Sequence, residues 1–123
     1  MNTINNVFYF LFLILAAVNV TPTVADEISE CRRLAPKYGA EIEAKLSDGT
    51  RCDLLSPRVA YEVDYARKWY SGIGQALHYA LVTGRRPGLI LLVRDPAKEW
   101  RHIYRAARVC GRHAIEFHIE RIE

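Results

Sequence analysis

The stretch from Val59 to Val93, VAYEVDYARKWYSGIGQALHYALVTGRRPGLILLV, decides the fold that the sequence predicts. Its first part, Val59–Tyr65, is rich in β-branched and aromatic side chains, which favour a strand. Ala66–Thr83 lacks proline and repeats apolar residues at three- and four-residue spacing, so a helix follows and ends before Gly84. Leu89–Val93 is an unbroken apolar run, which is typical of a strand covered on both faces. Strand, helix and strand in this order predict a parallel pair joined by a crossover helix.

The remaining segments complete the predicted order of elements. Ile28–Tyr38 has the apolar spacing of a short amphipathic helix. Ala40–Leu46 alternates apolar and charged residues, and a polar turn connects it to Arg51–Leu55, so the two segments predict a β-hairpin. Pro96–Gly111 predicts a third helix, and Ala114–Ile122 predicts a last strand. The sequence therefore predicts an α/β fold, a mixed central β-sheet flanked by helices in the order αβββαβαβ.

The first 25 residues contain no charged side chain and differ in this from the rest of the chain. Val7–Val18 is an apolar run that is too short to cross a bilayer comfortably, and Thr23-Val24-Ala25 resembles a small-residue cleavage site. We expect residues 1–25 to be a signal peptide cleaved after Ala25, which leaves one secreted or periplasmic domain, residues 26–123, with no stable membrane insertion. Because the segment lacks Lys and Arg, an uncleaved membrane anchor stays open as the alternative.

Charge and cysteine content narrow the function classes only slightly. The formal net charge of +3 permits contact with a polyanion without requiring it. Cys31, Cys52 and Cys110 allow three different single disulfides, among which the sequence alone does not choose. We favour Cys31–Cys110, because both residues fall on predicted helices near the ends of the domain. No Cys-x-x-Cys or paired-histidine spacing predicts a zinc site.

Three acidic residues are expected to meet on one face of the sheet. The period-2 alternation of Val59–Tyr65 directs Glu62 and Asp64 to the same face, and Asp53 on the preceding strand can reach the same place. Three converging carboxylates usually hold a divalent cation. On the following helix, Gln75 and Tyr79 lie seven and eleven positions after Lys68, so all three share one stripe.

The order of elements, with Asp53, Glu62 and the spacing of Gln75 and Tyr79, resembles the PD-(D/E)XK nuclease superfamily, in particular its RecB-type branch with a Gln-x-x-x-Tyr motif. The resemblance covers nearly all of residues 26–123. It implies a restriction-endonuclease-like fold and hydrolysis of phosphodiester bonds with Mg²⁺ or Mn²⁺. It also implies that Asp53 and Glu62 bind the metal and that Gln75 and Tyr79 support the site. The position of the family's lysine is occupied by Asp64.

This departure from the family pattern changes the expected chemistry. A carboxylate offers neither a proton nor positive charge to the attacking hydroxide and the phosphate. We expect Asp64 to complete the metal site and Lys68 to be the displaced lysine, with Lys45 as a weaker candidate. Glu41 is a further candidate acid. The alternative is a catalytically inactive binding module with the same fold, which the missing lysine favours; the retained acids and the Gln-x-x-x-Tyr spacing favour an enzyme.

The third predicted helix carries a basic stripe that is a candidate nucleic-acid surface. Its cations recur every three or four positions, along about 20 Å of helix, at Lys98, Arg101, Arg105, Arg108 and Arg112. Such a stripe would bind a phosphate backbone with salt-sensitive affinity, but a solvated helix face has the same pattern. Trp100 and Tyr104 are expected on the opposite, apolar face, and Trp69 and Tyr70 are expected as core and boundary aromatics. DNA or RNA as substrate, and the oligomeric state, stay open.

Overall fold

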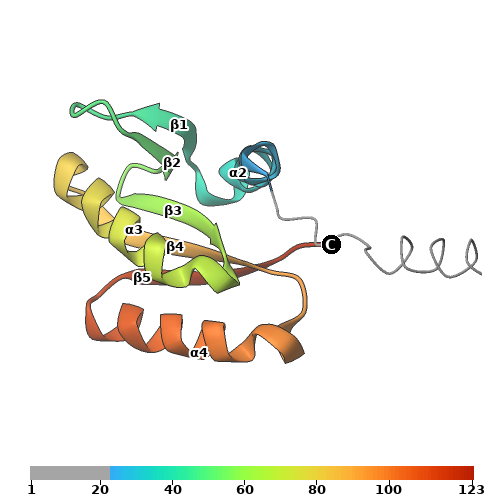
Figure 1. Ribbon diagram of the computed structural model, residues 1–123. Coiled ribbons are helices and arrows are strands. Elements are labelled where there is room, and N and C mark those ends of the chain that lie inside the picture. Colours follow the sequence, from blue (N-terminus) through green and yellow to red (C-terminus); the bar gives the residue numbers. More distant parts are fainter. Residues whose placement is uncertain (1–22) are drawn as a thin grey trace, which may run out of the picture.

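The computed structural model describes residues 23–123, which form a five-stranded sheet with helices on both faces (Figure 1). The elements follow the order that the sequence predicts, apart from a short 3₁₀ turn before the central helix. In chain order they are α2 (Val24–Tyr38), β1 (Glu41–Lys45), β2 (Arg51–Leu55), β3 (Val59–Tyr65), η1 (Ala66–Lys68), α3 (Trp69–Thr83), β4 (Arg86–Val93), α4 (Pro96–Arg112) and β5 (Glu116–Arg121).

The sheet is mixed, and its strands lie side by side in chain order from β1 to β5. Strands β1, β2 and β3 pair antiparallel, whereas β3, β4 and β5 pair parallel. Hairpin-type connections explain the first part, and the crossover helices α3 and α4 explain the second, because each returns the chain in the direction of the strand before it. The predicted α/β class and mixed sheet are confirmed.

Strand β4 begins at Arg86, three residues before its predicted start at Leu89. The predicted loop residues Arg86–Gly88 pair in parallel with Val59–Tyr61, so the neighbouring strand extends β4 backward. Proline is tolerated here because it lies at the start of the strand. Gly88 is required by packing, since a Cβ atom at this position would lie 2.3 Å from Cδ1 of Tyr61.

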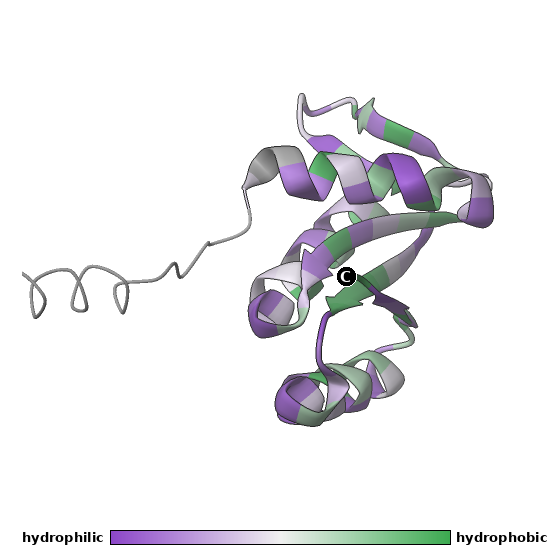
Figure 2. Ribbon diagram, turned by 90° about the vertical axis from the view of Figure 1, so that its right-hand side faces the viewer, coloured by the Kyte–Doolittle hydropathy of each residue, from purple (hydrophilic) through white to green (hydrophobic). Residues whose placement is uncertain are grey.

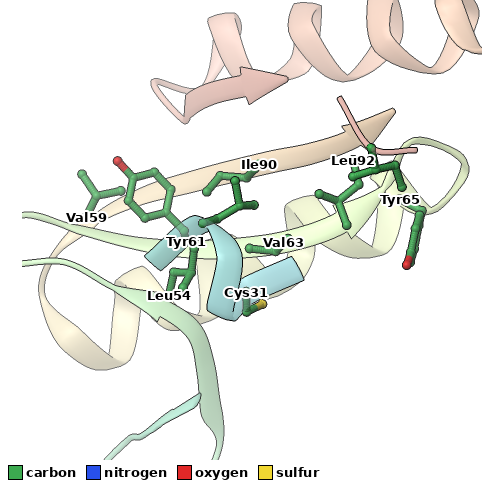
Figure 3. Close-up of a cluster of buried hydrophobic side chains, with 10 residues drawn as sticks. Cys31, Leu54, Val59, Tyr61, Val63, Tyr65, Ile90 and Leu92 are labelled. Atoms are coloured by element: carbon green, nitrogen blue, oxygen red, sulfur yellow. The ribbon is translucent and has the colours of Figure 1, made fainter. Parts of the chain in front are cut away.

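Hydrophobic side chains are packed on both faces of the sheet. On one face, Cys31 and Leu34 of α2 pack on side chains from β2, β3 and β4 (Figure 3). On the other face, α3 and α4 cover β4, with Trp69, Ala106 and Cys110 buried among its apolar side chains. Figure 1 shows α2 and α4 on either side of the strands, and Figure 2 shows hydrophobic and hydrophilic residues alternating along the helices. This alternation is the pattern expected for helices that cover a sheet with one face only.

The favoured disulfide between Cys31 and Cys110 is wrong. Cys31 belongs to the core under α2, whereas Cys110 belongs to the core under α4, so the sheet separates the two thiols. Cys31, Cys52 and Cys110 are all buried and free. Burial raises the pKa of Cys52 to about 12 and that of Cys110 to about 11, which keeps both thiols protonated at neutral pH.

Helix α2 begins at Val24, four residues before its predicted start at Ile28. Thr23 is its N-cap, and a reciprocal capping box joins Thr23 and Asp26. The cleavage point predicted after Ala25 therefore falls inside the first turn of this helix. Residues 1–22, which hold most of the predicted signal peptide, lie outside the described part of the chain. Within residues 23–123, no helix has the length and apolar character needed to cross a membrane.

Candidate functional site

The strand register aligns three acidic residues across β1, β2 and β3. On β1 and β2, the pairs Ile42–Leu54 and Ala44–Cys52 place Glu43 opposite Asp53. The pair Leu54–Tyr61 then places Asp53 opposite Glu62 on β3. The backbone departs from regular pairing at this row, since Glu43 has a φ of 50° and is absent from the β1–β2 pairs. A row of three carboxylates therefore crosses the antiparallel half of the sheet.

Asp53 is held between two strands by its own side chain. Its Oδ2 atom accepts a hydrogen bond of 2.9 Å from the backbone N–H of Val63. Strands β2 and β3 pair only at Leu54–Tyr61 and Leu55–Ala60, so the carboxylate takes the place of the next backbone partner. Burial raises the pKa of Asp53, and the charge of Glu43 adds to this effect, while the hydrogen bonds from Glu62 and Val63 oppose it.

Glu62 is the most perturbed acid of the described chain. Its side chain is buried, with 4% of the residue exposed, and its neighbours include Asp53 and Tyr79. Burial, followed by the neighbouring charge of Asp53, raises the pKa of Glu62 to about 10. Its Oε2 atom is buried without a hydrogen-bond partner among the described residues. Burial thus favours a protonated form of the Asp53–Glu62 pair, because it raises the pKa of both acids.

Asp64 faces the start of α3 and is engaged by Lys68. Its Oδ1 atom accepts a hydrogen bond of 2.9 Å from the backbone N–H of Tyr65, and it lies 3.9 Å from Nζ of Lys68. Burial raises the pKa of Asp64 to about 6, although the Tyr65 hydrogen bond and the Lys68 charge both lower it. The ammonium of Lys68 also donates a hydrogen bond of 2.9 Å to Oε1 of Glu27 on α2, the main cause of its raised pKa. Lys68 therefore joins two acids from different elements.

Gly72 provides the space in which Asp64 is buried. A Cβ atom at Gly72 would lie 3.5 Å from Cβ of Asp64 and 2.9 Å from Cδ1 of Leu89. The helix can therefore approach β3 closely only at a residue without a side chain. Gly74, two residues later, has no such neighbour within 4 Å.

The other residues predicted for the site lie apart from the acid pair. Gln75 is exposed, and its amide donates to the hydroxyl of Ser71 at 3.1 Å. Glu41 and Lys45 are exposed at the two ends of β1. Of the Gln-x-x-x-Tyr spacing, the structure thus brings only Tyr79 to Glu62.

Glu43 and Glu27 come to the site although the sequence analysis did not select them. The hairpin register places Glu43 there, whereas Glu27 arrives through the packing of α2. The alternation of residues on β1 indicates that Glu43 lies on the same face of the sheet as Glu41, which was selected. No pattern in the sequence indicates where α2 packs.

The predicted cations of α4 are all exposed, and the helix shows a second feature that the sequence analysis placed wrongly. Trp100 and Tyr104 were expected on the apolar face, but each is 54% exposed and lies among the arginines. The guanidinium of Arg101 lies 5.4 Å from the centre of the Trp100 ring, and that of Arg108 lies 5.6 Å from the Tyr104 ring. Ala106 and Cys110 are the residues that α4 buries.

Asp53 and Glu62 have the type of oxygen donor that a divalent cation would need. Mg²⁺ is usually held by one or two carboxylates, with water and substrate oxygens completing its shell. Asp53 and Glu62 provide such a pair, and the free Oε2 of Glu62 is an atom that a cation would satisfy. Within residues 23–123, no group of three or more acidic, histidine or cysteine side chains is close enough to form a larger site.

Comparison with models of protein families, with curated proteins and with solved structures finds no match to this chain. The fold and the site define an α/β protein with a pair of carboxyl groups between β2 and β3, of which Glu62 is buried and Asp53 half-buried, and with a cationic, aromatic α4.

Proposed function

We propose that the protein is a metal-dependent phosphodiester hydrolase of the PD-(D/E)XK type. One observation carries this proposal: Asp53 and Glu62 lie on adjacent strands, Asp53 half-buried and Glu62 buried, and Oε2 of Glu62 has no hydrogen-bond partner within residues 23–123. Leaving a buried carboxyl oxygen unsatisfied costs stability, and a bound cation is one way in which this atom would gain a partner. The same two residues are the metal ligands that the family resemblance implies.

The arrangement of the fold supports the proposal. The chain forms a helix, three strands, a helix and a strand, followed by a further helix and strand, and this order is compatible with the fold that the resemblance implies. The acid pair lies on the second and third strands, and the helix that follows contributes Tyr79 to it. Fold alone does not establish activity, so the proposal rests on the acid pair.

The residues present have distinct roles in the proposed reaction. Asp53 and Glu62 would bind Mg²⁺ or Mn²⁺, which polarises a phosphate oxygen and lowers the pKa of bound water. Tyr79 orients the Glu62 carboxyl group, and the Val63 N–H orients that of Asp53. Lys68, with 41% of its side chain exposed, presents a positive charge for the substrate phosphate, and Asp64 and Glu27 hold it in place.

The second candidate function is a catalytically inactive binding module with the same fold. The contacts of Lys68 favour it, because within residues 23–123 this ammonium forms salt bridges with Glu27 at 2.9 Å and Asp64 at 3.9 Å, but not with Asp53 or Glu62. Asp64, which was expected to complete the metal site, is engaged by Lys68 instead. An inactive module would keep the acid pair as a protonated element of the core.

Metal binding and hydrolysis by the full chain distinguish the two functions. Mn²⁺ and Mg²⁺ should raise the melting temperature at pH 8 but not at pH 5, because a bound cation must displace a proton from the acid pair. Single-stranded DNA, duplex DNA and RNA should be tested for cleavage with each metal. Asp53→Asn should abolish both the thermal shift and any cleavage.

The matched control is Asp48→Asn, since Asp48 is an exposed acid in the β1–β2 turn and is remote from the pair. This variant should keep the metal response of the wild type. If neither metal changes the melting temperature at any pH, the metal site does not exist. A metal response without cleavage of any of the three substrates would leave the inactive module as the function.

A further inference from the structure

A groove between α3 and α4 is separate from the acid pair and has its own chemistry. Its volume is about 540 Å³, and it lies between the first residues of α3 and the second half of α4. Trp69 and Tyr70 form one wall, and Tyr104, Arg105, Arg108 and Arg112 form the other. Trp69 directly follows Lys68, so the groove begins where the acidic site ends along the chain.

The charge of the groove is entirely positive. Arg105, Arg108 and Arg112 line it, and its lining contains no Asp or Glu. The only acid on α4 is Glu99, and its Oε2 atom accepts hydrogen bonds from the backbone N–H groups of Arg94 and Asp95 at the start of the helix. None of the α4 arginines forms a salt bridge with a described acid. The groove is therefore complementary to an anion.

Aromatic rings are exposed beside these cations. Tyr70 is 71% exposed and stacks on the buried Trp69 with ring centres 3.8 Å apart. One face of the Tyr70 ring is therefore supported by Trp69, while most of the side chain is in solvent. Across the groove, Tyr104 is 54% exposed and carries the Arg108 guanidinium near its ring. Large aromatic side chains lose hydrophobic stabilisation when they remain in water, and rings held open beside arginines suit a planar ligand.

We propose that this groove binds single-stranded nucleic acid, with bases stacked on Tyr70 and Tyr104 and the phosphates paired with Arg105, Arg108 and Arg112. Stacking platforms beside a cationic track are the general means of binding an unpaired strand, because every base has a face that can stack. The assignment rests on the proposed function and deepens it by naming an unpaired strand as the substrate class.

The aromatic rings distinguish a single strand from other polyanions. A duplex keeps its base faces stacked inside, so it could use the arginines but would gain little from Tyr70 or Tyr104. An anionic membrane surface also attracts helices rich in Arg and aromatic residues. Phosphatidylserine vesicles measured beside the single strand distinguish this alternative.

The test measures binding by the full chain in EDTA, with Asp53→Asn present to prevent cleavage. Fluorescein-labelled oligothymidylate is titrated and followed by anisotropy, beside a duplex of equal length and phosphatidylserine vesicles. Tyr104→Leu should weaken single-strand binding roughly 5- to 100-fold, whereas Tyr104→Phe should retain it. Arg108→Ala should reduce the slope of log Kd against log salt by about 0.7, the value for one phosphate of a single strand.

Arg32→Ala is the matched control for charge, because Arg32 is an exposed arginine on α2, on the other face of the sheet. It should leave the affinity unchanged. Equal affinity for duplex and single strand, unchanged binding by Tyr104→Leu, or binding to vesicles alone would each overturn the assignment. Absence of metal-dependent cleavage would not, because this binding assay contains no metal; the metal titration of the acid pair tests that function separately.

Discussion

Replacement of Glu62 by Gln should stabilise the protein, and by an amount that depends on pH. Glu62 has a pKa of about 10 in the folded protein against 4.5 for an unperturbed glutamate. An acid with a raised pKa keeps its stabilising contribution below the unfolded pKa and loses it as the pH rises toward the folded pKa. Gln has nearly the same shape, carries no charge, and can still donate to the Asp53 carboxylate.

The magnitude follows from the pH interval above 4.5. Each pH unit costs about 1.4 kcal/mol of folding free energy while the folded carboxyl stays protonated and the unfolded one is ionised. The cost for wild type is about 1 kcal/mol at pH 5.0 and about 4 kcal/mol at pH 7.5. Glu62→Gln should therefore exceed wild type in stability by about 3 kcal/mol more at pH 7.5 than at pH 5.0.

Urea unfolding followed by tryptophan fluorescence measures this difference, because Trp69 is buried and reports on unfolding. Glu120→Gln is the control, because it should change the free energy of unfolding in the opposite direction. Burial alone would raise the pKa of Glu120, but hydrogen bonds from Lys37 and Tyr38 lower it overall, so this acid stabilises the fold above its unfolded pKa. Glu120→Gln should therefore lose stability at pH 7.5. A Glu62→Gln variant with the same advantage over wild type at both pH values would refute the reasoning about burial.

Three further predictions follow from the described contacts. Gly72→Ala should destabilise the protein by about 1–3 kcal/mol, because the added methyl group would be 2.9 Å from Cδ1 of Leu89. Gly74→Ala should stabilise it by up to about 1 kcal/mol, because nothing lies within 4 Å of the added methyl group. Thermal melts compare the two variants, and equal effects would contradict the packing. The three cysteines should not react with a thiol reagent until urea is added, and reducing agent should not change the melting temperature. Thr23→Ala should cost about 1 kcal/mol through loss of the N-cap, so a chain beginning at Asp26 should melt below one beginning at Thr23.

Much of the fold could be predicted because the signals are local. The bounds of β2 and β3 agree with the sequence prediction, since alternation and turn residues on each side mark them. The start of β4 at Arg86 could not be predicted in the same way. Residues Arg86–Gly88 have the composition of a loop, and they join the sheet only because β3 offers backbone partners. This contribution of tertiary structure is absent from any local window of sequence.

The residues of the candidate site likewise include some that the sequence could predict and some that it could not. The meeting of Asp53 and Glu62 could be predicted from alternation on two neighbouring strands. Glu41 was chosen on β1, but the register of the hairpin places Glu43 beside Asp53 and Glu41 beside Leu55. Choosing correctly requires the number of residues in the turn and their pairing, and alternation gives only the face.

The position of Gln75 depends on the rotation of α3. Residues four apart on a helix differ in direction by about 40°, so Gln75 and Tyr79 share a stripe without sharing an environment. Burial of Gly72, Ala76 and Tyr79 fixes the rotation, which leaves Gln75 in solvent. The spacing of a motif thus locates a pair of residues on a helix, whereas packing decides which member of the pair reaches the site.

Asp64 lies where the family pattern that the sequence resembles has a lysine, and this difference affects which positive charge lies near the acid pair. Asp64 is buried on β3, and a lysine there would bring its ammonium beside Glu62 and Asp53, where it would hold both acids ionised. With an aspartate in its place, no Lys or Arg of residues 23–123 forms a salt bridge with Asp53 or Glu62, and burial raises the pKa of both acids. Lys68 compensates the charge of Asp64 rather than that of the pair. If the proposed metal binds here, its binding should release a proton more strongly than at a site that contains its own lysine, and pH should control occupancy.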